Sequence, residues 1–197
     1  MNNKNRKVWI DCGSYMGLIT RRFVLSDEYS DDFELYAFDI RCRMKGSILA
    51  YGVDFHQKAV WIEDGVIPVF LTSDSSMKGT SSGLYPSTKQ LREGQKLEEV
   101  SMPCFDLSSW IMEKFSVNDY IILKLDIEGA EYKVLQKMFD DGSIDYINRL
   151  YVEFHSNKRK KIDFDAHEAS WALHEKLSDI AGLELFVNED IPNPIGV

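Results

Sequence analysis

The chain has 197 residues, of which 44% are hydrophobic and 12% aromatic, and this length suits one globular domain with a sizeable core better than two. Its formal net charge of -9 disfavours binding to nucleic acid or to an anionic membrane surface, because both depend on clustered Lys and Arg. We therefore expect a single domain over residues 1–197 with no nucleic-acid partner.

The cysteines and the N-terminal segment favour a cytoplasmic protein. Cys12, Cys42 and Cys104 are odd in number and form no CxxC pair, so they predict neither a disulfide framework nor a zinc site. Few apolar residues precede Asp11, which does not resemble a signal peptide. No apolar run approaches the length of a membrane span. We expect reduced thiols and no membrane insertion.

In the first half of the chain, apolar segments alternate with polar turns. The residues expected to form strands are 7–11, 34–39, one stretch within 53–62, and 66–71, and those expected to form a helix are 18–25. Acids stand at the ends of the first two strands, at Asp11 and Asp39. The sequence Glu63-Asp64-Gly65 predicts a hairpin turn between the last two strands.

The second half continues the alternation after a polar interruption. Residues 72–94 are rich in Ser, Thr and Gly, which predicts a mobile loop able to close over a ligand. Helices are expected within 103–115, 130–139 and 164–180, and strands at 120–126, 149–154 and 183–187. This order predicts a Rossmann-like α/β fold: a doubly wound, mostly parallel sheet with helices on both faces, an inserted hairpin and the Ser/Gly-rich loop.

The turn after the first strand contains two glycines. Asp11-Cys12-Gly13-Ser14-Tyr15-Met16-Gly17 follows the pattern D-x-G-x-x-x-G and lacks the G-x-G-x-x-G of NAD-binding folds. A helix that begins near Gly17 suits an anion such as a carboxylate. Asp39, at the tip of the next strand, can accept hydrogen bonds from ribose hydroxyls. The two features together predict a site for an adenosyl ligand that carries a carboxylate.

Four segments resemble the FkbM-type methyltransferases, which use S-adenosylmethionine and have the class I methyltransferase fold. The segments are 8–17, Tyr36-Ala37-Phe38-Asp39, 59–65 and Lys124-Leu125-Asp126-Ile127-Glu128-Gly129-Ala130-Glu131, and the last is the most specific. Glu153 and His155 match the E-x-H ending of the family. The chain departs from the family pattern at Asp39-Ile40, where Glu-Pro is usual, and in its short tail. The resemblance implies methyl transfer to an oxygen, often a hydroxyl of a sugar or glycan.

The resemblance and the glycine turn together assign two groups of residues. The cofactor group is Asp11, Gly13, Ser14, Tyr15, Met16, Gly17, Asp39, Ile40, Asp54, Lys58 and Ala59. The catalytic group, beside the acceptor, is Asp126, Glu128, Glu153 and His155. Asp126, Glu153 or His155 can take the hydroxyl proton, or the same groups can hold a divalent cation such as Mg²⁺ or Ca²⁺, and the sequence leaves this choice open. Glu131 is read instead as a first-turn acid that favours the helix dipole or faces solvent.

Other functions remain open at this point. A non-catalytic module could bind S-adenosylmethionine and recruit a partner of a glycan-synthesis pathway, but the intact acids Asp39, Asp126 and Glu128 argue against it. The glycine pattern argues against a dehydrogenase. The basic run Lys158-Arg159-Lys160-Lys161 is read as a solvated turn, with an anionic acceptor as the alternative. The sequence names neither the acceptor nor the oligomeric state.

Overall fold

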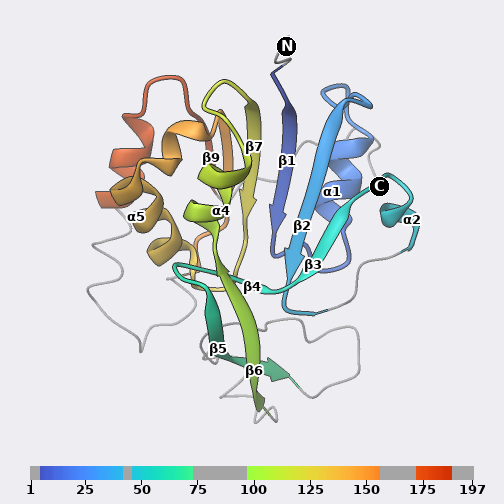
Figure 1. Ribbon diagram of the computed structural model, residues 1–197, viewed down its shortest axis with the longest axis vertical. Helices are drawn as coiled ribbons and strands as arrows, with labels where there is room; N and C mark the ends of the chain where they lie inside the picture. Colours follow the sequence, from blue (N-terminus) through green and yellow to red (C-terminus); the bar gives the residue numbers. More distant parts are fainter. Residues whose placement is uncertain (1–4, 42–45, 73–96, 156–171, 188–197) are drawn as a thin grey trace.

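The computed structural model describes residues 5–41, 46–72, 97–155 and 172–187 (Figure 1). The loop predicted for 72–94 begins at Thr72, the last residue of a strand, and otherwise lies outside the described residues. The basic run at 158–161 lies outside them as well. Within the described part of the chain, no helix is long and apolar enough to cross a membrane.

Six described strands form a central sheet in the order β3-β2-β1-β7-β8-β9, and every neighbouring pair is parallel. The strands are β1 (Lys7–Cys12), β2 (Phe33–Asp39), β3 (Asp54–Gln57), β7 (Tyr120–Leu125), β8 (Arg149–Val152) and β9 (Glu184–Val187). The chain extends the sheet in one direction from β1 to β3 and then returns to add β7 on the other side of β1 (Figure 1). Strand order therefore reverses between β1 and β7, which is where ligands bind in such sheets.

Helices cover both faces of the central sheet, as the alternating pattern predicted. The described helices are α1 (Leu18–Val24), α2 (Gly46–Leu49), α4 (Leu107–Lys114), α5 (Glu131–Asp141), the 3₁₀ helix η1 (Ser143–Tyr146) and residues 172–178. On one face Trp9 stacks on Phe23 of α1 with ring centroids 4.3 Å apart. On the other face Val8 and Ile10 pack in the same cluster as side chains of α4, α5 and residues 172–178. Adjacent residues of β1 thus pack on opposite faces of the sheet, because side chains alternate along a strand.

A second, three-stranded sheet corrects the predicted hairpin. It contains β4 (Ala59–Trp61), β5 (Gly65–Thr72) and β6 (Leu97–Asp106) in the order β4-β6-β5. The turn at 63–65 does not pair β4 with β5, because β6 lies between them, parallel to β4 and antiparallel to β5. The strand expected within 53–62 is also divided, since β3 joins the central sheet and β4 the second sheet.

The segment 103–115 contains the end of β6 followed by the helix α4. The sequence predicted a helix within 103–115 with Asp106 or Ser108 as its cap, and α4 lies within this range, while Pro103 to Asp106 complete β6. The helix then begins at Leu107, where the Asp106 side chain accepts a hydrogen bond from the Ser109 amide at 3.1 Å. Asp106 is therefore the N-cap that satisfies one of the free amides of the first turn. The second sheet and the central sheet meet at this junction (Figure 1).

Candidate functional site

The glycine turn lies against the end of β7. Gly13 and Ser14 donate backbone hydrogen bonds to the Phe38 carbonyl at 2.8 and 3.1 Å, and the Asp126 amide donates to the Cys12 carbonyl at 3.0 Å. Gly13 has φ = 81°, and a Cβ atom there would lie 1.8 Å from the Asp126 carbonyl oxygen. Only glycine allows this approach, which brings the ends of β1, β2 and β7 together at the reversal point.

A pocket with a volume of about 200 Å³ opens at these strand ends. The predicted residues that line it are Gly13, Tyr15, Asp39, Ile40, Lys58, Ala59, Asp126 and Glu128. The lining residues that sequence reasoning missed are Phe38, Arg41, Val60, Ile67, Val69, Ile127 and Ala130. Ile67 and Val69 come from β5 of the second sheet, so this sheet supplies part of the apolar wall of the pocket.

The carboxylate of Asp39 is fixed by the backbone on either side of it. Its Oδ2 accepts a hydrogen bond from the Tyr15 amide at 2.7 Å, and its Oδ1 accepts one from the Arg41 amide at 2.7 Å. Burial raises the pKa of Asp39, while these two amide hydrogen bonds act to lower it. Tyr15 takes a left-handed conformation at φ = 50° in making its contact. The glycine turn and the tip of β2 are thus joined through one acid at the pocket.

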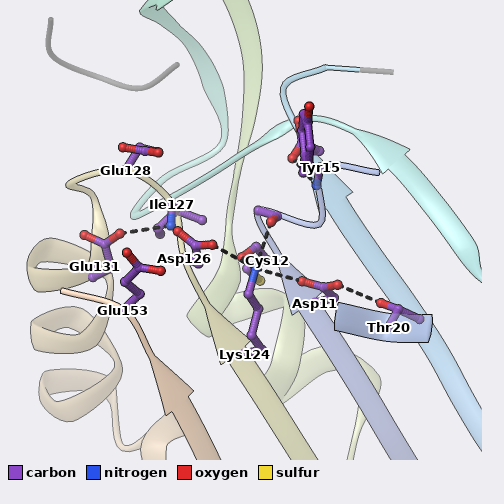
Figure 2. Close-up of polar contacts among 12 residues, drawn as sticks. Asp11, Cys12, Tyr15, Thr20, Lys124, Asp126, Ile127, Glu128, Glu131 and Glu153 are labelled. Carbon is purple, nitrogen blue, oxygen red and sulfur yellow. Dashed lines mark hydrogen bonds and ion pairs between the residues drawn. The ribbon is translucent and has the colours of Figure 1, made fainter. Parts of the chain in front are cut away.

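A buried lysine links the glycine turn to Asp126. The Lys124 Nζ lies 3.1 Å from Asp11 Oδ1 and 3.3 Å from Asp126 Oδ2, and it donates a hydrogen bond to the Gly13 carbonyl at 2.8 Å. Thr20 donates to the other oxygen of Asp11 at 2.6 Å, so the order across the site is Thr20, Asp11, Lys124, Asp126 (Figure 2). Asp11 is fully buried and does not line the pocket. It acts behind the pocket, through Lys124.

The four predicted catalytic residues lie together at the ends of β7 and β8. The His155 side chain is 3% exposed, and its Nε2 lies 3.4 Å from Glu153 Oε1, 3.6 Å from Asp126 Oδ1 and 3.7 Å from Glu128 Oε2. Asp126 and Glu128 line the pocket, whereas Glu153 and His155 do not. Burial raises the pKa of Asp126, and the neighbouring Lys124 opposes this shift.

Glu131 lies in the first turn of α5, as the sequence indicated, but it does not face solvent. Its side chain is fully buried, and its carboxylate accepts hydrogen bonds from the amides of Ile127 and Gly129 at 2.9 to 3.2 Å. The His155 Nδ1 lies 2.8 Å from Glu131 Oε1. Burial lowers the pKa of His155, but this hydrogen bond and the charges of Glu131, Glu128 and Asp126 outweigh it and raise the pKa overall. The reading of Glu131 as a solvent-facing acid is therefore wrong: it closes the turn between β7 and α5 and orients His155.

Several predicted cofactor residues lie away from the pocket. Asp54 is exposed on β3, with its Oδ1 3.1 Å from the His56 Nε2. Met16 and Gly17 precede α1 without lining the pocket, and Gly17 is its N-cap at φ = 75°. The Ser14 hydroxyl is buried and has no hydrogen-bond partner among the described residues. Within the glycine turn, only Gly13 and Tyr15 line the pocket.

Lys124 is the site residue that sequence reasoning quoted without a role. A lysine within an otherwise apolar strand is the signal that could have identified it, because a buried lysine requires partners. Its partners are visible only in the folded chain: Asp11 is more than a hundred residues earlier, across the β1–β7 pair.

The parallel sheet, the reversal point and the acid-lined pocket define a Rossmann-like α/β protein with a ligand site at the strand ends. The methyltransferase FkbM domain matches residues 11–179, which is most of the chain. The chain belongs to the FkbM methyltransferase family and is a methyltransferase. Comparison with curated proteins and with solved structures gave no match.

Proposed function

We propose that the protein binds S-adenosylmethionine in this pocket and transfers its methyl group to a hydroxyl of a sugar, glycan or similar small acceptor. One observation carries the proposal: Asp39, at the end of β2, and Asp126, at the end of β7, line the same pocket. Asp39 is the group expected to bind a ribose, and Asp126 is a carboxylate at the place where an acceptor would enter.

The lining residues fit an adenosyl cofactor. A carboxylate has about four acceptor positions, and the amides of Tyr15 and Arg41 use two of those on Asp39. The remaining positions suit the two vicinal hydroxyls of a ribose. Val60, Ile67 and Val69 line the pocket with apolar side chains that suit the faces of an adenine ring.

The chemistry needs a methyl donor, an aligned oxygen and a place for a proton. When bound, S-adenosylmethionine supplies a methyl group on a positively charged sulfur, which keeps the electron pair of the broken S–C bond and leaves as a thioether. The acceptor oxygen forms the new O–C bond and loses its proton. Asp126 and Glu128 line the pocket, and one of these carboxylates takes up that proton. The raised pKa of Asp126 makes it a stronger base than an exposed aspartate.

Lys124 fixes the position of the glycine turn relative to Asp126. It contacts the Gly13 carbonyl on the cofactor side and the Asp126 carboxylate on the acceptor side. Correct placement of acceptor and methyl group accounts for a large part of the rate of a displacement reaction. A rigid bridge between the glycine turn and Asp126 therefore supports transfer between two bound molecules.

Calorimetry with S-adenosylmethionine and with NAD, followed by transfer of a labelled methyl group to a panel of sugars and glycans, tests the proposal. We expect saturable binding of S-adenosylmethionine alone and labelled product with at least one hydroxyl acceptor. Binding of NAD in its place would contradict the cofactor assignment. Labelling only of nitrogen or carbon acceptors would contradict the acceptor class.

A further inference from the structure

The ring of His155 has one nitrogen fixed and the other directed at carboxylates. Its Nδ1 lies 2.8 Å from Oε1 of Glu131, whose carboxylate also accepts the amides of Ile127 and Gly129. An ionised carboxylate only accepts hydrogen bonds, so Nδ1 carries the hydrogen in this contact. In the neutral ring the lone pair is then on Nε2.

The lone pair on Nε2 of His155 faces carboxylate oxygens. The Nε2 atom lies 3.4 Å from Glu153 Oε1 and 3.6 Å from Asp126 Oδ1, and the ring is almost fully buried. A lone pair that faces carboxylate oxygens is unfavourable unless a positive charge lies between them, either a proton on Nε2 or a metal ion. The buried histidine therefore distinguishes this cluster from a group of exposed acids.

The distances favour the metal ion over the proton. A charged N–H···O hydrogen bond brings its two heavy atoms to about 2.7–2.9 Å. Ligand atoms that share one cation at about 2.1 Å are instead about 3.0–3.4 Å apart, depending on whether the geometry is octahedral or tetrahedral. The observed 3.4 and 3.6 Å are closer to the second value.

We propose that His155 Nε2, Asp126 Oδ1 and Glu153 Oε1 bind one divalent cation. Both oxygens of Glu131 already accept backbone amides, so we assign Glu131 the role of orienting the histidine. A metal-binding histidine commonly donates its other nitrogen to a carboxylate in this way. The two carboxylates suit Mg²⁺, Ca²⁺ or Mn²⁺, and the imidazole suits a transition-metal ion, so Mn²⁺ is the probe that matches both kinds of ligand.

The neighbouring contacts fit this assignment. Lys124 holds Oδ2 of Asp126 at 3.3 Å, which leaves Oδ1 directed toward His155. Figure 2 shows Asp126, Glu131 and Glu153 gathered on one side of Lys124, with Asp11 and Thr20 on the other side.

The role of the cation, though not its binding, rests on the proposed function. Asp126 lines the pocket, so a cation at its Oδ1 would border the acceptor side. A bound cation lowers the pKa of a coordinated hydroxyl. Glu128, which also lines the pocket, would then be the carboxylate that takes up the proton.

Titration with Mn²⁺, followed by electron paramagnetic resonance, tests the site without cofactor or acceptor, because bound Mn²⁺ loses the sharp signal of the free aqueous ion. We expect one saturable site per chain, with affinity lowered tenfold or more in Glu153→Gln and in Asp126→Asn. Glu153 is half-exposed, so its variant is expected to fold like the parent, which thermal unfolding verifies. Glu113→Gln removes the same charge from the exposed side of α4 and should leave Mn²⁺ affinity unchanged.

Three results would overturn the cation site: no saturable Mn²⁺ binding by the parent, unchanged affinity in both site variants, or an equal loss in Glu113→Gln. The first would leave the proton on His155 as the explanation of the cluster. Failure of the proposed function is a separate result. A chain that binds Mn²⁺ but transfers no methyl group refutes only the function, and one that transfers fully in excess chelator without binding Mn²⁺ refutes only the cation.

Discussion

Replacement of Lys124 by methionine tests the central electrostatic feature of the site. The change keeps most of the apolar length of the side chain and removes the ammonium that lies 3.1 Å from Asp11 Oδ1. Asp11 is fully buried, and among the side chains that the structure describes it would keep only the hydrogen bond from Thr20, at 2.6 Å. Removal of one partner from a buried ion pair costs about 3–5 kcal/mol, because the remaining charge stays out of water. We expect Lys124→Met to lower the free energy of unfolding by this amount.

Lys7 provides the matched control. Its Nζ lies 3.2 Å from Asp32 Oδ1, almost the same distance as in the buried pair, but both side chains are about two-fifths exposed. An exposed ion pair of this kind contributes about 0–1 kcal/mol. Urea unfolding of Lys124→Met and Lys7→Met therefore compares two lysine–aspartate pairs that differ chiefly in burial.

A double variant shows whether the cost comes from the uncompensated charge. In Asp11→Asn/Lys124→Met the buried carboxylate is neutralised, so the combined loss should be smaller than the sum of the single losses by about 1–3 kcal/mol. If Lys124→Met lost no more stability than Lys7→Met, or if the two site substitutions were additive, the role assigned to burial in this ion pair would be refuted.

Three further substitutions address the pocket. Asp39→Ala should weaken S-adenosylmethionine binding about ten- to a hundredfold by calorimetry, since a hydrogen bond to a charged group contributes about 1.5–3 kcal/mol. Because burial raises the pKa of Asp39, its carboxylate should become protonated at a higher pH than an exposed aspartate. As the pH is lowered, the parent should therefore lose affinity for S-adenosylmethionine at a pH above the usual aspartate range, and the variant should lack this loss. Asp126→Asn should lower turnover by about a hundred- to ten-thousandfold with cofactor affinity within a few-fold of the parent, and the reverse pattern would place Asp126 in the cofactor site. Gly13→Ala should destabilise the fold by about 3 kcal/mol or more in urea unfolding, from the 1.8 Å contact added to a left-handed φ. Gly142→Ala, with φ = 78° and open space around the added carbon, should cost only about 1–2 kcal/mol, and equal losses in the two variants would exclude the contact as the cause.

Most of the central sheet and its helices could be predicted from the sequence. The apolar run of β7 is long enough to require burial on both faces. The apolar residues of α1 have helical spacing and come immediately after the glycine turn in the sequence. The boundary of α4 at Asp106 and the end of α5 at Gly142 also follow from capping preferences. These signals lie within a few residues of the feature they predict, which is why they can be read without the fold.

The second sheet was not predictable in the same way. The turn at 63–65 has the composition of a hairpin, yet β5 pairs with β6, whose sequence contains two adjacent glutamates and a proline. Strand pairing depends on the surface that a partner offers as well as on local propensity, and here the partner is distant in the chain. Because β5 contributes Ile67 and Val69 to the pocket, the apolar wall was missed together with the pairing.

The sequence by itself determined which acids end the strands and which turn needs glycine, and it placed Asp39 and Asp126 at one edge of a parallel sheet. Tertiary structure decided what each charged group does there. Glu131 and Lys124 are polar in any conformation, but burial removes the water that would solvate them, so each requires a partner within the protein. Glu131 finds two backbone amides and His155, and Lys124 finds Asp11 and Asp126. Those partners come from separate strand ends, which only the folded sheet brings within hydrogen-bonding distance.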